Sequence, residues 1–173
     1  MRKSEISQTY LKSLMDYNPE TGDFIWTAIR KGVKKTKHAG TTNLVGYRQI
    51  EIDGVIYLAH RLAWFYIHGR WPAHQIDHIN GVRHDNRLCN LREATQSQNS
   101  ANSKIHIGNS TGVKGVILHQ CGKYMVLIGW QGQKIYRGLF STLAEAEIER
   151  KRAEDELHGE FAWRRPSDVT DSA

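Results

Sequence analysis

Cysteine is scarce in this chain of 173 residues, which contains only two, Cys89 and Cys121. They lie far apart in the sequence, and neither has a second thiol nearby. This spacing excludes a zinc knuckle of the C-x-x-C type and argues against a disulfide framework. We therefore expect two free thiols, no structural zinc and a reducing compartment.

Long apolar runs are also missing. The first residues, MRKSEISQTYLKSL, are charged and lack the apolar segment of a signal peptide, and the most apolar run, YLAHRLAWFYIHG, is interrupted by His60 and Arg61. Neither stretch has the continuous apolar length that a membrane span requires. The sequence predicts a soluble, cytoplasmic protein with no membrane partner.

Acidic residues are outnumbered by basic ones. Lys and Arg total 24 against 18 Asp and Glu, which gives a formal net charge of +6. Such a balance is typical of proteins that meet a polyanion, and nucleic acid is the leading candidate, although many basic proteins bind nothing anionic. With 39% hydrophobic residues, the chain can build one ordinary domain or two small ones.

Residues 1–58 predict an N-terminal module of one helix and β-hairpins. Apolar residues recur at helical spacing over residues 6–14. The stretch YNPETGDFIW then has Pro and Gly where a tight turn needs them, and Asp53-Gly54 joins two β-rich runs, which is a strong hairpin signal.

A basic loop, IRKGVKKTKHAGTTN, separates these hairpins. Two interpretations stay open: a solvated loop, or a loop that lies along a phosphate backbone. In the second interpretation the DNA contacts include Lys34, Lys35 and Lys37.

Residues 59–104 are expected to form a separate core. It begins with HRLAWFYIHG, which predicts a short buried helix closed by Gly69. His60 could be a ligand, but a lone histidine beside an apolar helix is more often a structural hydrogen-bonding residue, and we favour that interpretation.

The C-terminal part predicts a second small domain. Residues 105–111 have the composition of a linker, and residues 112–163 contain three β-type runs that indicate a three-stranded antiparallel meander. A helix follows, marked by a capping box at Thr142 and Glu145, and residues 164–173 form a disordered tail. The predicted fold class of the whole chain is α+β.

The polar stretch QIDHINGVRHDNRLCNLREATQSQN carries the candidate chemistry. Asp77 and His78 end a strand-like run, and a capping box at Thr95 and Gln98 places Asn99 one turn inside a helix. A carboxylate and an amide oxygen suit a hard divalent cation, and a histidine that is not a ligand can act as a base. The alternative is that these residues only cap turns.

The spacing of Asp77-His78, Asn90 and Asn99 resembles the HNH signature, in the form found in phage and intron homing endonucleases. The resemblance extends over HRLAWFYIHGRWPAHQIDHINGVRHDNRLCNLREATQSQN. It implies a ββα-metal core in which His78 is the general base and Asn90 is a structural member of the catalytic site. It also implies that Asp77 and Asn99 hold one ion.

That ion is expected to be Mg²⁺ or Mn²⁺, because Asn99 stands where many members have histidine, which puts Zn²⁺ in doubt. Arg83 is expected to contact DNA. We interpret His84 and Asp85 as residues of a loop near DNA, although either could be recruited to the site. Phage origin would place the protein in the host cytoplasm.

The C-terminal part resembles the DNA-binding domain of plant ethylene-response factors, through GVKGV, GKYMVLI, RGLFSTLAEA and LHGEFA. This implies a three-stranded sheet in the DNA major groove. Several residues depart from that family, which puts base-specific contacts in doubt: lysine replaces arginine once, tyrosine replaces tryptophan twice, and Arg150 interrupts the apolar helix face. The alternative is a solvated basic sheet, and we expect Trp130 to be core. The implied contact residues are Lys114, His119, Lys123, Tyr124, Tyr136 and Arg137.

The sequence thus predicts a monomeric, metal-dependent endonuclease that acts on double-stranded DNA. It would nick or cleave the duplex site-selectively, without a protein partner, and leave 5′-phosphate and 3′-hydroxyl ends. The alternative is a non-enzymatic, DNA-binding transcriptional regulator with a decayed HNH core. The joint presence of Asp77, His78, Asn90 and Asn99 argues against it.

Overall fold

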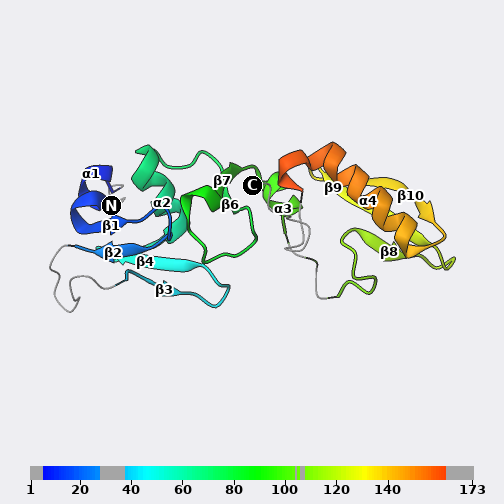
Figure 1. Ribbon diagram of the computed structural model, residues 1–173, viewed down its shortest axis with the longest axis horizontal. Helices are drawn as coiled ribbons and strands as arrows, with labels where there is room; N and C mark the ends of the chain where they lie inside the picture. Colours follow the sequence, from blue (N-terminus) through cyan, green and yellow to red (C-terminus); the bar gives the residue numbers. More distant parts are fainter. Residues whose placement is uncertain (1–5, 28–37, 104, 106–107, 163–173) are drawn as a thin grey trace. The chain divides into compact units, whose positions relative to one another are not determined.

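The computed structural model describes residues 6–27, 38–103, 105 and 108–162. The chain divides into two compact units, Met1–Glu93 and Ala94–Ala173 (Figure 1). Each unit combines helices with small antiparallel sheets, so the predicted α+β class is confirmed.

The first unit opens with helix α1, Gln8–Leu14, and a hairpin of strands β1, Met15–Tyr17, and β2, Phe24–Trp26. The Ser7 side chain caps α1 by accepting a hydrogen bond from the backbone of Tyr10 at 3.2 Å. The predicted helix and hairpin are therefore both confirmed.

A three-stranded sheet follows, made of β3, Thr41–Thr42, β4, Arg48–Ile52, and β5, Val55–Leu58. Asp53 and Gly54 join β4 to β5 with φ values of 52° and 75°, the left-handed pair that a tight hairpin turn requires. This turn was predicted from the Asp-Gly pair alone.

Helix α2, Ala59–His68, leaves the end of β5 and stops at Gly69, whose φ is 70°. The main core of the first unit lies between α2, α1 and the strands. Its fully buried members include Leu11, Met15, Phe24, Ile50 and Leu62.

Strands β6, Gln75–His78, and β7, Leu91–Ala94, then pair as a two-stranded sheet. A single 3₁₀ turn, η1, Leu88–Asn90, precedes β7. Helix α3, Gln96–Ala101, starts at the predicted capping box and belongs to the second unit. The order of these elements along the chain is strand, strand, helix.

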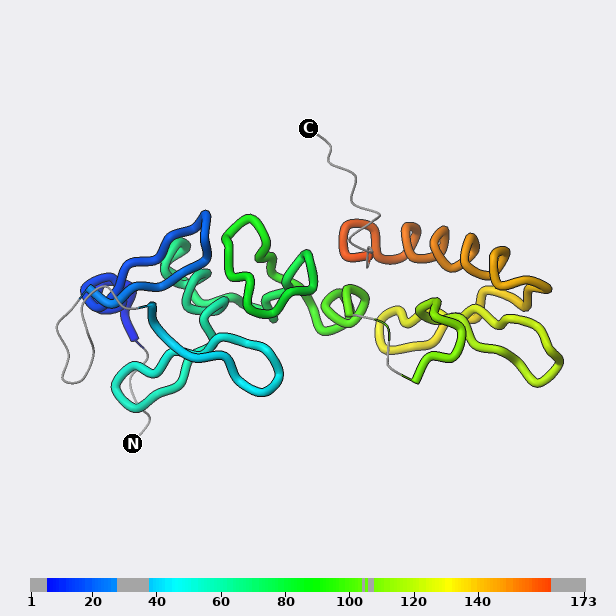
Figure 2. Tube along the Cα trace, turned by 60° about the horizontal axis from the view of Figure 1, so that its bottom comes forward, coloured from blue at the N-terminus to red at the C-terminus, as the bar shows by residue number. Residues whose placement is uncertain are grey.

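The second unit contains a meander of β8, Val116–Leu118, β9, Tyr124–Trp130, and β10, Gln133–Phe140. Helix α4, Leu143–His158, runs along one face of this sheet in both views (Figures 1 and 2) and ends in the 3₁₀ turn η2, Gly159–Phe161.

Several local expectations can be compared with the structure. Thr142 and Glu145 form the predicted capping box of α4. Trp130, which we expected to be core, is instead half-buried, with its ring centroid 5.5 Å from that of His158. Cys89 and Cys121 are both free and exposed. Within the described part of the chain, no helix combines the length and apolarity needed to cross a membrane.

Candidate active site

Strand β6 buries two ionisable side chains in succession. Asp77 is 3% exposed and His78 is 4% exposed. The Asp77 carboxylate meets Arg92 on the neighbouring strand β7, whose Nε and Nη2 atoms lie 2.9 Å and 2.8 Å from Oδ2. The cross-strand pairing of β6 with β7 thus neutralises a carboxylate that would otherwise be a costly buried charge.

The His78 ring is held by aromatic neighbours and by one amide. Its centroid lies 5.0 Å from that of His60, at an interplanar angle of 86°, and 5.9 Å from that of Tyr47. Burial lowers the pKa of His78, against the smaller raising effects of its hydrogen bond to Asn86 and of the nearby Asp77 and Asp85 carboxylates. The imidazole is therefore neutral at neutral pH, as a general base must be.

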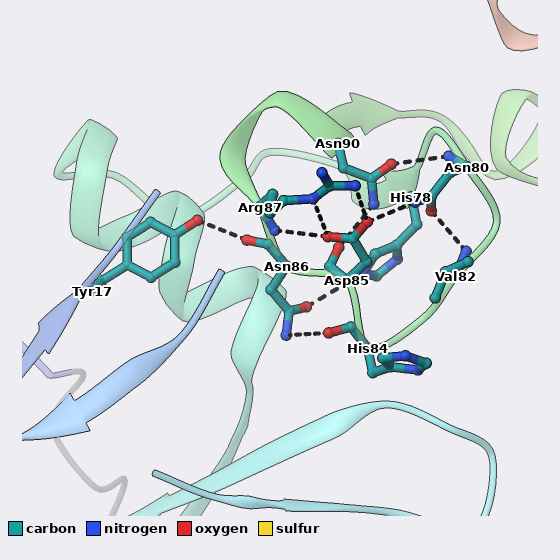
Figure 3. A network of polar contacts seen from close by, with 9 residues as sticks. All are labelled: Tyr17, His78, Asn80, Val82, His84, Asp85, Asn86, Arg87 and Asn90. Carbon is teal, nitrogen blue, oxygen red and sulfur yellow. Dashed lines mark hydrogen bonds and ion pairs between the residues drawn. The ribbon is translucent and has the colours of Figure 1, made fainter. Parts of the chain in front are cut away.

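Asn86 contacts one ring nitrogen of that base. Its Oδ1 lies 3.4 Å from His78 Nε2, while its Nδ2 donates a hydrogen bond to the carbonyl of His84 at 3.3 Å (Figure 3). Oδ1 can only accept, so this contact is a hydrogen bond in the tautomer that carries the hydrogen on Nε2 of His78. In that tautomer the lone pair is on Nδ1.

Asn90 joins the two sides of the loop between β6 and β7. Its Nδ2 donates to the carbonyl of Asp85 at 2.8 Å, and its Oδ1 accepts from the backbone N–H of Asn80 at 2.9 Å. Its own carbonyl accepts from Ile79 at 2.9 Å. These hydrogen bonds suit the structural role predicted for Asn90, which is to hold the loop between the two strands.

Asp85 organises the same loop (Figure 3). Its carboxylate accepts hydrogen bonds from Arg87 Nε at 2.8 Å, Arg87 Nη2 at 2.6 Å and Asn80 Nδ2 at 2.6 Å. The Arg87 guanidinium is the main reason that the pKa of Asp85 is lowered to about 2. The loop histidine, His84, is exposed.

The β1–β2 hairpin supports this loop from the other side. Tyr17 donates from its hydroxyl to the carbonyl of Asn86 at 2.7 Å, and the backbone of Leu88 donates to the carbonyl of Pro19 at 2.9 Å. At Gly22, an added Cβ would lie 2.5 Å from backbone atoms of Asn86 and Arg87. The hairpin therefore fits against the loop backbone without room for a side chain.

Sequence reasoning missed Tyr17, Asn86 and Arg92. Tyr17 and Asn86 are 69 positions apart, so no local pattern connects them. The one available signal was that Asn86 lies in a run, HDNRLCN, with more polar groups than a turn needs.

His60 acts through packing in the described structure. Its ring contacts those of Tyr47 and His78, at centroid distances of 5.3 Å and 5.0 Å. Its buried Nδ1 has no hydrogen-bond partner among the described residues, so the expected hydrogen-bonding role does not extend to that atom. Burial is the main reason that the pKa of His60 is lowered to about 3.

The predicted DNA contacts of the first unit have differing outcomes. Arg83 donates to the carbonyl of Val45 at 2.8 Å and lies over the Tyr47 ring at 5.2 Å. It therefore connects the site loop to the turn before β4. The predicted contacts Lys34, Lys35 and Lys37 lie outside the described residues.

In the second unit, two of the predicted basic contacts face inward. Lys114 donates to the carbonyls of Ala101 and Ser103, both at 2.6 Å, at the C-terminal end of α3. Burial is the main reason that the pKa of Lys114 is lowered to about 8. Arg137 forms ion pairs with Glu149, at 3.4 Å, and Glu156 on α4.

The other predicted contacts of this unit differ in exposure. His119 and Lys123 are exposed in the turn between β8 and β9, and Tyr136 is exposed on β10. Tyr124 is half-buried against the core. Asn99, the predicted metal ligand, lies on α3, where its N–H donates to the carbonyl of Thr95 at 2.9 Å. Its partnership with Asp77 stays a prediction.

The chemistry of Asp77 fits a hard cation, because it supplies a buried carboxylate in contact with a positive group. The amide of Asn99 is an oxygen donor of the same kind, and its pairing with Asp77 at one ion stays a prediction. Among the residues described, no three His, Cys, Asp or Glu side chains gather as a metal site. Only two protein ligands would leave coordination positions for water and phosphate oxygens, which suits Mg²⁺ or Mn²⁺.

A neutral buried histidine beside a carboxylate, in a strand–strand–helix segment, is an arrangement suited to metal-assisted phosphodiester hydrolysis. Comparison with known families agrees: residues 57–101 match the family model described as HNH endonuclease. The match covers the end of β5 through α3 and supports an HNH nuclease domain, with DNA as its substrate, in this part of the chain. Searches of curated proteins and of solved structures gave no match.

Proposed function

We propose that this protein is a site-selective, metal-dependent endonuclease of the homing type. It would hydrolyse phosphodiester bonds of duplex DNA and leave 5′-phosphate and 3′-hydroxyl ends. The observation that carries the proposal is the neutral, buried His78 directly after the buried Asp77 on β6, within the segment that matches the HNH family.

In this proposal, Nδ1 of His78 removes a proton from the attacking water. Asn86 holds the opposite ring nitrogen, so the lone pair keeps its direction during the reaction. The nearby carboxylates of Asp77 and Asp85 favour the protonated form that results. A base positioned in this way typically accelerates hydrolysis about 10² to 10⁴-fold.

The oxygen atoms of Asp77 and Asn99 would hold one divalent cation, Mg²⁺ or Mn²⁺. When bound, such an ion neutralises charge on the scissile phosphate and on the leaving oxygen. Arg92 stays against Asp77 Oδ2 and fixes the direction of the carboxylate. Asn90 keeps the loop closed so that β6 retains its position.

The remainder of the chain would bind the duplex. The basic loop with Lys34, Lys35 and Lys37, together with the exposed Lys123, would contact phosphates, which positions DNA without reading its sequence. A monomer has a single site and cuts one strand at a time, so nicking is the expected reaction.

Incubation of supercoiled plasmid with the purified protein and Mg²⁺ or Mn²⁺ tests the proposal. We expect nicked circles from the wild type and none from His78→Ala, with DNA binding retained in both. The matched control is His84→Ala, which removes an exposed histidine of the same loop and should nick normally. If the wild type binds DNA but never cuts it with any divalent ion, the protein is a DNA-binding regulator instead.

A further inference from the structure

The sheet of the second unit has two different faces. Helix α4 covers one, where Val116, Val126 and Ala146 form a buried cluster. Residues paired directly across strands share a face, and side chains alternate between faces along each strand. The side chains of the other face, which we call the open sheet face, are Ile117, Met125, Leu127, Lys134, Tyr136 and Leu139.

The open sheet face is apolar and accessible. Ile117 is 47% exposed, Tyr136 is 56% exposed and Leu139 is 40% exposed. Met125 and Leu127 lie half-buried between them. These neighbouring side chains form a continuous surface, and exposed apolar patches of this kind mark interaction sites.

The charge around this face favours a polyanion. No Asp or Glu occurs in the sequence between Glu93 and Glu145, so the whole sheet lacks carboxylates. The acidic residues of the described second unit are all on α4 or η2, and α4 is on the opposite face. Lys134 on the open sheet face and Lys123 in the adjoining turn are exposed.

A β-bulge removes the one arginine of the sheet from this face. The register shifts between Tyr136 and Gly138, and the extra residue, Arg137, turns toward Glu149 and Glu156 on α4. Hydrogen bonding to base edges is therefore left to Lys134 and Tyr136. The aliphatic side chains supply most of the contact surface.

We propose that the open sheet face selects thymine-rich sites by packing its aliphatic side chains against thymine C5-methyl groups, in the major-groove placement that the resemblance to ethylene-response factors implies. The proposal rests on the proposed function, which takes duplex DNA as the substrate. The major groove, about 12 Å wide, admits a β-ribbon, and the thymine methyl is the apolar group that bases present there. An apolar, carboxylate-free sheet matches that groove in both shape and charge.

Deoxyuridine tests this inference because it pairs as thymidine does and lacks only the methyl group. We would measure binding of the full chain, with EDTA present to prevent cutting, to a duplex of alternating adenine and thymine and to its uracil counterpart. Each buried methyl contributes about fourfold in affinity, so two contacts predict roughly fifteenfold weaker binding to the uracil duplex. In a guanine–cytosine duplex, 5-methylcytosine should strengthen binding over cytosine.

Single variants locate the effect. Ile117→Ser, and independently Leu139→Ser, should bring the affinity ratio for the thymine and uracil duplexes toward one while the circular dichroism spectrum stays unchanged. The matched control is Ile148→Ser on α4, an equally apolar residue that is 70% exposed and away from the sheet. It should leave the ratio at its wild-type value.

Equal affinity of the wild type for the two duplexes would overturn the proposal. So would self-association in sedimentation experiments that Ile117→Ser abolishes, because the face would then bind a second copy of the chain. Plasmid nicking by the same preparation would still support the proposed function in either case. If the protein keeps the methyl preference but does not nick plasmid, the inference about the sheet stands and the proposed function fails.

Discussion

Replacing Gly22 with alanine should separate the support of the site loop from the chemistry of the site. Gly22 has φ near +77°, and a Cβ built there lies 2.5 Å from Arg87 N and from the carbonyl carbon of Asn86. A left-handed backbone costs a residue with a side chain about 1 to 2 kcal/mol. Because the close atoms belong to backbone, a side-chain rotation cannot relieve the contact, and the loop must move.

Movement of the loop should lower activity more than stability. Asn86 sets the direction of the His78 lone pair through a contact of 3.4 Å, so a shift of its backbone misdirects the base. Misplacement of a catalytic group by about 1 Å can cost about 10²-fold in rate. We therefore expect Gly22→Ala to nick plasmid about 10²-fold more slowly in single-turnover assays. The free energy of unfolding in urea should fall by more than the roughly 1 to 2 kcal/mol that the left-handed backbone alone costs.

Gly46→Ala is the matched control in the same unit. Gly46 has φ near +91°, and the closest atoms to an added Cβ belong to the Arg83 side chain at 3.9 Å, an ordinary contact. This variant carries only the cost of the left-handed backbone, about 1 to 2 kcal/mol, and should keep its nicking rate. If Gly22→Ala also nicks at the wild-type rate, the hairpin does not hold the loop in its active position.

Three further variants test other contacts. Tyr17→Phe leaves the carbonyl of Asn86 without its partner and should lower the free energy of unfolding in urea by about 1 to 3 kcal/mol; an unchanged value would mean that water replaces the hydroxyl. Arg92→Leu removes the ion-pair partner of the buried Asp77 carboxylate and should cost about 3 to 5 kcal/mol, whereas the double variant Asp77→Leu/Arg92→Leu should recover much of it; equal losses would contradict a specific pair. His60→Phe tests pH dependence. The pKa of His60 is about 3 in the folded chain against 6.5 for an exposed histidine, so below pH 6.5 protons favour the unfolded state. Stability should fall by roughly 1.4 kcal/mol per pH unit as the pH drops from 6.5 toward 3, and His60→Phe should flatten urea midpoints over that interval; an unchanged slope would assign the loss to other groups.

Elements with local signals were predictable from the sequence. The Asp53-Gly54 turn, the end of α2 at Gly69 and the capping box at Thr142 each depend on residues within one or two turns of each other. In such cases the backbone conformation follows from the residue types themselves. The strand that ends at His78 and the helix start at Thr95 had local signals of the same kind, whereas the second strand was implied by the resemblance to HNH nucleases.

Contacts between distant segments were not predictable in this way. The pairing of Asp77 with Arg92 depends on the register of β6 and β7, and the support of Asn86 by Tyr17 depends on how a separate hairpin packs. The sequence also does not indicate which group a basic side chain contacts. Lys114 was predicted to contact DNA, yet its ammonium donates hydrogen bonds to the backbone carbonyls of Ala101 and Ser103. The sequence pattern gives no indication of these partners.

The contacts of Lys114 bear on how modular this protein is. Lys114 stands just before β8, yet it satisfies carbonyls at the C-terminal end of α3, the helix that carries Asn99. A nuclease fragment that ends at residue 104 would lose this cap and leave those carbonyls to solvent. Exchange of the C-terminal domain for another binding module would therefore require a new cation at the same place, so retargeting such an enzyme means transplanting α3 together with its sheet.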